Sequence, residues 1–308
     1  MRKLILLCAS LCSMGLLFAA SPAWAQSVLW VASNGSDGNV CGQTTPCATF
    51  QGAINKGGAS QINCLTSGNY GAFTITASIT IDCGTGNVGT VSVTGSGTIA
   101  ITISTSSAAT IVLRHLSLNG NNSGGFGIFT SGFASGTLVV EDCTIQGFTS
   151  DGIFFVPSAG RSLLQVSDSR IFNNGNGIIV APGNNQIASV TLNRVELTGN
   201  LIDGLFLGGS GVIAGTMRGS VVAENAQIGV IAEASQVFFT VEESSVVANL
   251  TAGIQTNSAG TVVNVGASTI GANGTGVLPS SGSLISFGNN QMSANGTDGN
   301  FTSTKALR

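Results

Sequence analysis

Apolar and polar residues alternate along most of the chain in short runs that are separated by bends. The segment 190–205, reading VTLNRVELTGNLIDGL, has two apolar-x-apolar pairs that begin at Val190 and Val195, followed by Asn200 and then by a glycine with an apolar neighbour. A two-residue period is that of a β-strand, whereas a helix repeats every 3.6 residues. The segment therefore predicts three short strands joined by bends.

The same pattern occurs eight times, at intervals of 22 to 27 residues. The copies open at Ile111, Leu138, Leu164, Val190, Gly215, Phe239, Val263 and Ile285. Three residues after the last apolar position come Asn121, Phe148, Asn174, Asn200, Asn225, Asn249, Asn273 and Asn295. One copy cannot bury its own apolar face, but copies that stack on one another can. The repeat predicts a β-solenoid in which the asparagines stack as a hydrogen-bonded ladder.

These copies resemble the right-handed parallel β-helix repeat of the pectate-lyase-like superfamily, with its asparagine ladder. The preceding segment resembles that superfamily's N-terminal cap, in WVASNGSDGN (30–39), TPCATFQGAIN (45–55) and GNYGAFTITASITI (68–81). The resemblance implies an all-β fold: one right-handed parallel β-helix with three strands per coil and an N-terminal capping helix. It specifies the activity only weakly, because this scaffold hosts lyases, hydrolases, epimerases and proteins with no known reaction.

Residues 1–25 are predicted to be a secretory signal peptide, with two basic residues, an apolar run at 4–20 and a small-x-small cleavage motif at 23–25. An uncleaved membrane anchor is the alternative, which the short apolar run disfavours. Because the periodicity does not break, residues 26–308 are predicted to form a single β-helix domain, with a cap at 26–60 and eight regular coils at 111–308. We expect a secreted or periplasmic protein with no membrane span after signal cleavage.

Within the cap, residues 48–56 (ATFQGAINK) form the one convincing amphipathic helix pattern in the sequence. A helix there would cover the open end of the first coil, where strand groups are otherwise unpaired. The register of the strands between residues 62 and 110 does not follow from the pattern.

Composition agrees with a solenoid, since 44 of 308 residues are glycine and only 7% are charged. Without Arg2 and Lys3, the mature chain has 8 basic and 13 acidic residues and a net charge of −5. No basic patch occurs, so neither nucleic acid nor an anionic membrane is an expected partner.

Five cysteines remain after signal cleavage, and export would permit disulfides. Cys64 and Cys83 occupy matching places in INC and IDC, and adjacent coils about 4.8 Å apart would bring them within bonding reach. Cys41 and Cys47 flank a short loop and would pair locally, although two other connectivities stay open. Cys143 falls in a column of mostly small residues and is expected to be a buried, inert thiol and not a nucleophile.

Charged residues gather at the bend between the first and second strands of each copy. Stacking the copies predicts five oppositely charged neighbours: Arg114–Glu141, His115–Asp142, Asp168–Arg194, Arg170–Glu196 and Arg218–Glu242. Such pairs stabilise an exposed surface by roughly 0.2–1 kcal/mol each and require no catalytic role. One predicted contact, Asp142 beside Asp168, joins two like charges. Two carboxylates this close are tolerated if they bind a cation, share a proton or separate into water.

This acidic contact is the predicted functional cluster. Glu141, Asp142 and Asp168 are the candidate metal ligands, with calcium as the possible cofactor, because calcium takes carboxylate oxygens. The resemblance to calcium-dependent lyases implies that Asp168, Arg170 and Arg194 are the candidate catalytic residues. Two carboxylates would alternatively act as acid and base in glycoside hydrolysis. The chain departs from these families in lacking a hydrolase aspartate triplet, any lysine between Lys56 and Lys305, and clear aromatic subsites.

Two functions remain open. The first is an exported protein that binds or cleaves an extended, acidic polysaccharide, with a polysaccharide or cell-surface glycan as its partner. The second is a non-catalytic surface, adhesive or structural β-solenoid.

Overall fold

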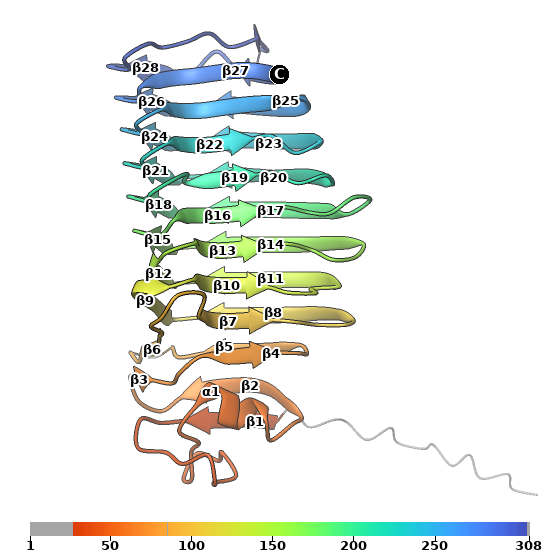
Figure 1. Ribbon diagram of the computed structural model, residues 1–308, viewed down its shortest axis with the longest axis vertical. Helices are drawn as coiled ribbons and strands as arrows, with labels where there is room; N and C mark the ends of the chain where they lie inside the picture. The colour runs from red at the N-terminus through yellow and green to blue at the C-terminus, as the bar shows by residue number, and fades with distance from the viewer. Residues whose placement is uncertain (1–26, 85, 307–308) are drawn as a thin grey trace, which may run out of the picture.

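The computed structural model describes residues 27–84 and 86–306, in which short strands wind around a common axis and each coil lies on the one before (Figure 1). All paired strands run parallel, as between β11 (Ser135–Glu141) and β14 (Arg161–Ser167). One sheet has ten strands, one from each successive coil, and the other has nineteen. The predicted all-β fold, a right-handed parallel β-helix with three strands per coil, is confirmed.

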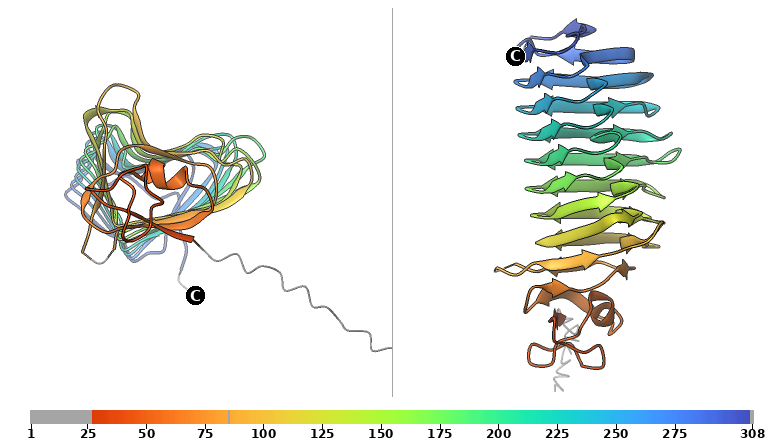
Figure 2. Two further views of the ribbon diagram at one scale, coloured as in Figure 1. Left: turned by 90° about the horizontal axis from the view of Figure 1, so that it is seen from below. Right: turned by 60° about the vertical axis from the view of Figure 1, so that its left-hand side comes forward.

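The strands fall into three sets, visible as three sides when the coils are viewed along the axis (Figure 2). The first strands are β1 (Ser27–Val31), β2 (Ala59–Cys64), β5 (Ile79–Asp82), β8 (Ala108–Arg114), β11, β14, β17 (Ile187–Asn193), β20 (Val212–Arg218) and β23 (Gln236–Glu242). The second strands are β3 (Gly68–Asn69), β6 (Gly89–Ser92), β9 (Leu116–Gly124), β12 (Thr144–Phe148), β15 (Arg170–Phe172), β18 (Glu196–Thr198), β21 (Val221–Ala223), β24 (Ser245–Val247), β26 (Thr269–Gly271) and β28 (Gln291–Ser293). The third strands are β4 (Phe73–Ile75), β7 (Ile99–Ile103), β10 (Phe126–Thr130), β13 (Asp151–Phe155), β16 (Asn176–Val180), β19 (Leu205–Leu207) and β22 (Ile228–Ala232). In the last coils β25 (Ala252–Gly266) and β27 (Thr275–Ser286) each run on from a third strand into a first strand, and β29 (Ser303–Thr304) pairs with β27.

The first strands pair in the register that the spacing of the copies predicts. Leu138 pairs with both Ile111 and Leu164, and Val190 pairs with Leu164 and Gly215. Alternation places one residue inward and the next outward, which is why Phe155 and Phe239 are fully buried whereas Phe238 is 54% exposed. The inward-facing apolar residues of the strands therefore form one continuous core along the axis.

The opening of the eighth copy is wrong by one residue. Val263 pairs with Leu284, which is buried, and Ile285 lies outward and partly exposed. A slip of one residue moves every side chain of a strand to the other face. Because Leu284 and Ile285 are both apolar, the sequence pattern does not show which of them faces inward. The register is restored at the next bend, where the Ser268 backbone N–H donates to Asn290 Oδ1 at 3.0 Å.

The asparagine ladder is present inside the corner between the second and third strands. Asn200 Nδ2 donates to Asn225 Oδ1 at 2.9 Å, and the same bond links Asn225 to Asn249 at 2.8 Å. The ladder consists of Asn174, Asn200, Asn225, Asn249, Asn273 and Asn295. Each asparagine also accepts from the backbone N–H of the preceding one, so the corner is hydrogen-bonded coil to coil.

Asn121 does not belong to the ladder, contrary to the sequence prediction. Phe148 pairs with Gly124, whereas Gln146 pairs with Asn119, so β9 carries three residues more than β12 between the same two points. Asn121 lies in this excess and is exposed. Counting three residues from the last apolar position does not detect such a bulge.

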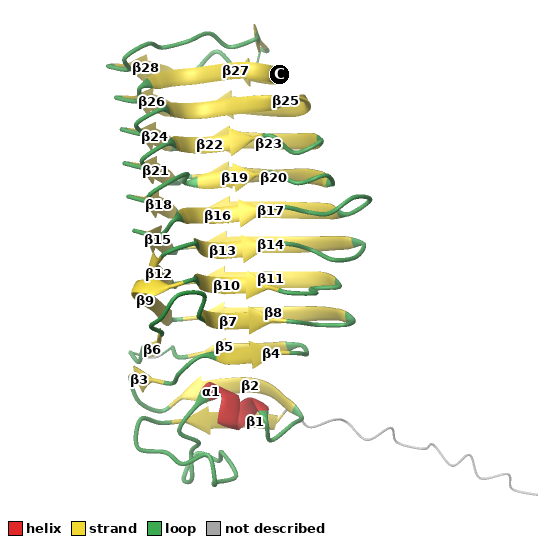
Figure 3. Cartoon of the chain, in the orientation of Figure 1, coloured by secondary structure: helices red, strands yellow, loops and turns green. Residues whose placement is uncertain are grey.

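The N-terminal end carries the one helix among the described residues, α1 (Phe50–Ile54), which is shorter than the expected 48–56 (Figure 3). Thr49 Oγ1 caps it by accepting from the Gly52 N–H at 2.8 Å. Phe50 is fully buried against Tyr70 and Phe73, and the Gln51 side chain accepts from the backbone N–H of Thr74 at 2.8 Å. The helix thus satisfies a strand donor at the first coils; that it serves as the cap of the solenoid stays a prediction.

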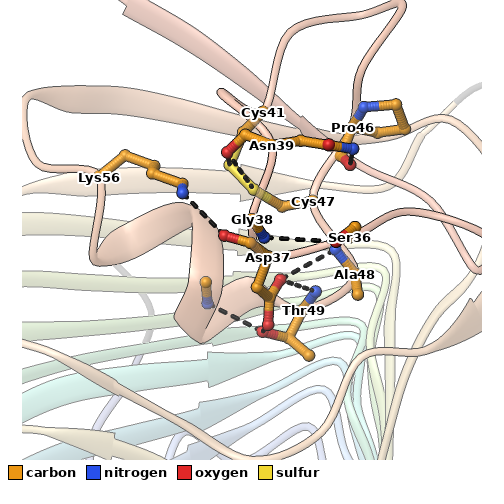
Figure 4. The surroundings of a disulfide bond; sticks show 11 residues. Ser36, Asp37, Gly38, Asn39, Cys41, Pro46, Cys47, Ala48, Thr49 and Lys56 are labelled. Atoms are coloured by element: carbon orange, nitrogen blue, oxygen red, sulfur yellow. Dashed lines mark hydrogen bonds between the residues drawn. A yellow bond between two sulfur atoms is a disulfide. The ribbon is translucent and has the colours of Figure 1, made fainter.

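Both expected disulfides are present, Cys41–Cys47 (Figure 4) and Cys64–Cys83. Beside the first, Asp37 Oδ1 accepts from the backbone N–H groups of Ala48 and Thr49 at 2.9 Å. Cys143 is free and buried, and burial raises the pKa of its thiol to about 12, which agrees with an inert role.

The predicted signal segment, residues 1–25, lies outside the described residues. Among the residues that the structure describes, no helix has the length and apolarity that crossing a membrane requires.

Candidate functional site

One outward-facing position at the end of each first strand, or one residue before its end in β1 and β2, forms a column along the solenoid. In register, the column reads Trp30, Asn63, Asp82, Arg114, Glu141, Ser167, Asn193, Arg218 and Glu242. We call the charged residues of this column, of the bend that follows it and of the first position of the next strand the bend face: Asp82, Arg114, His115, Glu141, Asp142, Asp168, Arg170, Arg194, Glu196, Arg218, Glu242 and Glu243. It includes every residue that the sequence proposed as a site.

The bend repeats one backbone conformation in coil after coil. Its second residue has a positive φ in every copy: His115 (55°), Asp142 (50°), Asp168 (50°), Arg194 (52°), Gly219 (57°), Glu243 (48°), Ala267 (48°) and Gly288 (82°). Because the chain turns in the same way each time, equivalent side chains leave the bend in equivalent positions and meet their neighbours one coil away.

Four of the five predicted charge contacts are present. Arg114 Nε lies 2.6 Å from Glu141 Oε2, and Arg170 Nε lies 2.7 Å from Glu196 Oε2. Arg194 donates from Nε and Nη2 to the two carboxylate oxygens of Asp168, both at 2.6 Å. His115 Nε2 is 3.7 Å from Asp142 Oδ2, an ion-pair distance that is too long for a hydrogen bond.

The fifth contact is wrong in its partner. Arg218 pairs in backbone register with Glu242, yet its guanidinium donates to both carboxylate oxygens of Glu243, at 2.6 and 2.9 Å. A two-point bond between guanidinium and carboxylate is stronger than a single one, so side-chain geometry overrides the nearest register position. Glu243, the bend residue with a positive φ, is the one that forms this two-point bond.

The ion pairs keep these groups charged. Hydrogen bonds from Arg194 lower the pKa of Asp168, and hydrogen bonds from Arg218 lower the pKa of Glu243. The pKa of Arg194 is raised chiefly by Asp168, with a smaller contribution from the nearby charge of Asp142. Arg194 therefore pairs with Asp168 and is only weakly affected by Asp142.

The predicted metal cluster is not assembled as a ligand set. The carboxylate of Asp168 bonds to Arg194, that of Glu141 to Arg114, and that of Asp142 lies towards His115. Within residues 27–84 and 86–306, no group of three or more His, Cys, Asp or Glu side chains is placed to hold a metal ion. The donor chemistry suits calcium but the arrangement does not fit it, and calcium binding stays a prediction.

The three candidate catalytic residues belong to two separate ion pairs. Asp168 and Arg194 are joined to each other, whereas Arg170 bonds to Glu196 and lies 5.0 Å from the centre of the Phe172 ring. All three are exposed at neighbouring coils. Their catalytic role is untested by this geometry.

Sequence reasoning missed a histidine–carboxylate pair on the same face. His115 Nδ1 lies 2.8 Å from Asp82 Oδ1, and because an ionised carboxylate only accepts, Nδ1 carries the hydrogen. Nε2 of the same ring lies on the side of Asp142. An imidazole oriented in this way is suited to take a proton at Nε2.

Asp82 also borders a hollow of about 250 Å³ whose other lining residues are Trp30, Gln61, Asn63, Cys64 and Gly84. Trp30 adds an aromatic ring to the bend face, where the sequence showed no clear aromatic subsite. The matching INC and IDC segments contained the signal for this site, because Asn63 and Asp82 each precede an equivalent cysteine and therefore share a column.

The fold defines the class of the molecule: a parallel β-helix protein. The solved structure of pectate lyase Pel9A is similar, with a TM-score of 0.71 and 16% identity, over 92% of this chain and 80% of that chain. The A-module of the mannuronan C-5 epimerase AlgE4 from Azotobacter vinelandii is similar with a TM-score of 0.51 and 14% identity, over 84% of this chain and 95% of that one. No family model and no curated protein matches the sequence. At these identities the likeness shows the fold, which confirms the pectate-lyase-like β-helix architecture.

Proposed function

We propose that this protein is exported and binds or cleaves an extended acidic polysaccharide along the bend face. The observation that carries the proposal is the placement of positive charge. Of the eight basic residues that follow residue 26, four lie on this face: Arg114, Arg170, Arg194 and Arg218. Arginine binds carboxylates with two parallel hydrogen bonds, and its repetition along the axis suits a polymer with regularly spaced carboxylates.

Each arginine already bonds to a protein carboxylate, so a uronate would bind by exchange. The carboxylate of the sugar would replace Asp168 or Glu196 on the exposed guanidinium, at little net electrostatic cost because these pairs are solvated. Asp168, Arg170 and Arg194 are the residues proposed to hold the reacting sugar. For cleavage, we add His115, oriented by Asp82, as the group that removes a proton. No step is assigned to calcium.

Two proteins of the same fold bear names that concern polysaccharides, a pectate lyase and a mannuronan epimerase. This favours a polysaccharide or a cell-surface glycan as the partner. The two disulfides favour an oxidising compartment, and with the predicted signal peptide they support secretion or periplasmic localisation.

The alternative is a non-catalytic surface, adhesive or structural solenoid. The specific observation in its favour is that every arginine of the bend face has a carboxylate partner within 2.7 Å. A surface ladder of satisfied ion pairs needs no ligand to explain it.

The test is calorimetric titration of the purified protein with oligogalacturonate and oligomannuronate, each with and without calcium, followed by an assay for new chain ends. The double variant Arg170→Gln, Arg194→Gln should lose about tenfold or more in affinity, since two charge-assisted contacts are removed. Arg161→Gln is the matched control, because Arg161 is exposed at the opposite end of β14. Binding without new chain ends would support polysaccharide binding and reject cleavage, and the absence of binding to either uronan would reject the proposal.

If chain ends do appear, His115→Gln should remove cleavage and retain binding. Equal loss of both would mean that His115 acts in binding and not in proton transfer.

A further inference from the structure

A hollow lined by amide side chains lies at the corner that follows the second strands β9, β12 and β15. Its volume is about 330 Å³, and its lining residues are Asn119, Asn121, Asn122, Gln146, Gly147 and Asn173. None of these residues is charged. The hollow lies beyond the bend face along each coil, and it has no part in the function proposed above.

The hollow exists because the regular coil is interrupted there. The three excess residues of β9 displace Asn121 and Asn122 outward, and both adopt a positive φ, 50° and 56°. The asparagine ladder ends at the same corner, since Phe148 occupies the place of the next ladder residue. Asparagine is one of the few non-glycine residues that tolerate this left-handed conformation, so the bulge forms here without glycine. Bulges of this kind are frequent next to functional sites.

The amides of the hollow divide into a fixed part and a free part. Asn121 Nδ2 donates to Ser92 Oγ at 2.7 Å and to the Val93 carbonyl at 3.0 Å, which anchors the bulge. Asn119 Oδ1 accepts from the backbone N–H of Asn121 at 2.9 Å. In contrast, the side-chain amides of Asn122, Gln146 and Asn173 form no hydrogen bond with any residue that the structure describes.

Three free carboxamides present both donors and acceptors around one small hollow. Each amide offers two N–H groups and one carbonyl oxygen, which matches adjacent hydroxyl groups that also donate and accept. The volume is at the small end of the range for ligand sites, roughly 300–1,000 Å³, and accommodates a single ring. The absence of charge among the lining residues disfavours an ionic ligand.

An aromatic ring stands at the rim. Phe172 pairs in register with Gln146, precedes Asn173, and is half-buried. Arg170 lies over its ring at 5.0 Å from the centroid, which holds the ring in place. The rim therefore offers an apolar surface against the C–H face of a sugar ring, next to amides that reach its hydroxyls.

We propose that this hollow is a binding subsite for one residue of a neutral carbohydrate, held by Asn122, Gln146 and Asn173 and flanked by Phe172. The ligand chemistry is an uncharged polyhydroxy ring, in contrast to the uronates proposed for the bend face. A neutral sugar unit would bind without displacing any protein hydrogen bond described here.

The test uses ¹⁵N-labelled protein titrated separately with cellohexaose, maltohexaose and mannohexaose, with hexagalacturonate as the charged comparison. At least one neutral hexasaccharide should shift the side-chain amide signals of Asn122, Gln146 and Asn173, which single substitutions assign. The variants Asn122→Ala, Gln146→Ala and Phe172→Ala should each weaken that binding about tenfold.

Matched controls are Gln165→Ala and Phe238→Ala, which remove an exposed amide and an exposed ring from the first strands and should leave the affinity unchanged. The far-ultraviolet circular dichroism and melting temperature of each variant establish that it is folded. The proposal is overturned if no neutral hexasaccharide shifts these signals, or if the three variants bind as the wild type does. Shifts caused by hexagalacturonate alone would also overturn it, because the hollow would then select a charged sugar.

Discussion

The asparagine ladder and the bend face are built by the same device, the stacking of equivalent residues one coil apart, yet they differ in regularity. The ladder repeats one side chain through six coils, with amide-to-amide distances between 2.8 and 3.3 Å. The bend face is a series of separate pairs, with Arg114 bound to Glu141 and Arg194 bound to Asp168. Asp142 and Asp168, the predicted like-charged neighbours, belong to different pairs.

The difference follows from chemistry and burial. An amide both donates and accepts, so each asparagine can continue the chain of bonds, whereas an arginine only donates and a carboxylate only accepts, so identical charged residues cannot bond to one another. The ladder asparagines from Asn174 to Asn273 are at most 1% exposed, and an unpaired amide there would lack both a protein and a water partner. The bend face lies in water, where each pair contributes little and substitutions are tolerated.

The largest effect is expected from Asn200→Leu. The change removes Oδ1, which accepts from both the backbone N–H and the Nδ2 of Asn174, at 3.1 and 3.3 Å. Two buried donors are left without an acceptor, so the free energy of unfolding should fall by about 3 kcal/mol. Urea denaturation of the variant and the wild type measures it.

Asn193→Leu is the control for this substitution, because Asn193 lies in the outward column of the neighbouring strand. Its effect should stay within about 0.5 kcal/mol. Equal effects at Asn200 and Asn193 would show that burial is not what makes the asparagine ladder more important for stability than the outward column.

A smaller effect on stability is expected from Asp151→Asn, which replaces a buried carboxylate by a neutral amide. Asp151 is 5% exposed, accepts from Asn176 Nδ2 at 2.8 Å, and has a pKa that burial raises to about 6. The folded state therefore binds a proton more tightly than the unfolded state. The stability that results is complete below pH 3.8 and is lost as the pH rises through about 6.

Asparagine does not ionise, so the variant does not lose stability as the pH rises. It should therefore be more stable than the wild type by about 2 kcal/mol at pH 8 and almost equally stable at pH 3.5. Denaturation midpoints across that pH range measure the difference. A stabilisation that is independent of pH would contradict the assigned pKa.

Asp168→Asn is the opposite case, because Arg194 lowers the pKa of Asp168. The stability from that pair is present at neutral pH and is lost as the pH falls through the lowered pKa.

The smallest effect is expected on the bend face. Arg194→Gln removes the positive charge that pairs with Asp168 and acts on Asp142, so the melting temperature should fall slightly at low salt and recover at about 1 M salt, where the screening length is about 3 Å. A salt-independent decrease would indicate lost packing instead of lost charge pairing.

The same variant tests the calcium prediction. If Glu141, Asp142 and Asp168 bind calcium in the wild type, calcium should raise its melting temperature by mass action. The ion pairs seen here predict a different outcome: no shift in the wild type, and a shift only after Arg194→Gln frees the Asp168 carboxylate. Abolition of that shift by the further change Asp142→Asn would identify the ligands.

Much of the fold was predictable because it depends on local patterns that stacking repeats. The pairs that open at Leu138, Leu164 and Val190 mark a strand, and their constant interval marks the coil. The failures occur where the spacing changes locally. Neither the excess residues around Asn121 nor the choice between Leu284 and Ile285 alters the apolar pattern that the prediction used.

The site was less predictable, because it depends on the direction of side chains. Register alone pairs Arg218 with Glu242, and only the positive φ at Glu243 brings the actual partner to the guanidinium. His115 and Asp82 are 33 residues apart in an irregular part of the chain, where unequal coil lengths hide their adjacency. The pairs Arg114–Glu141 and Arg170–Glu196 were predictable because they lie in coils of regular length.

The repeated left-handed bend has a consequence for the scale on which the protein meets a linear molecule. From His115 to Ala267 the left-handed bend residue occurs once per coil, so these positions are spaced along the axis like neighbouring strands, about 4.8 Å apart. A polymer whose repeat is commensurate with this interval finds the same environment at each coil it crosses. A polymer with a different repeat drifts out of phase after a few coils, however well its first unit is accommodated. The backbone of the bend thus sets a length standard for any elongated ligand, and it does so independently of which side chains occupy the positions.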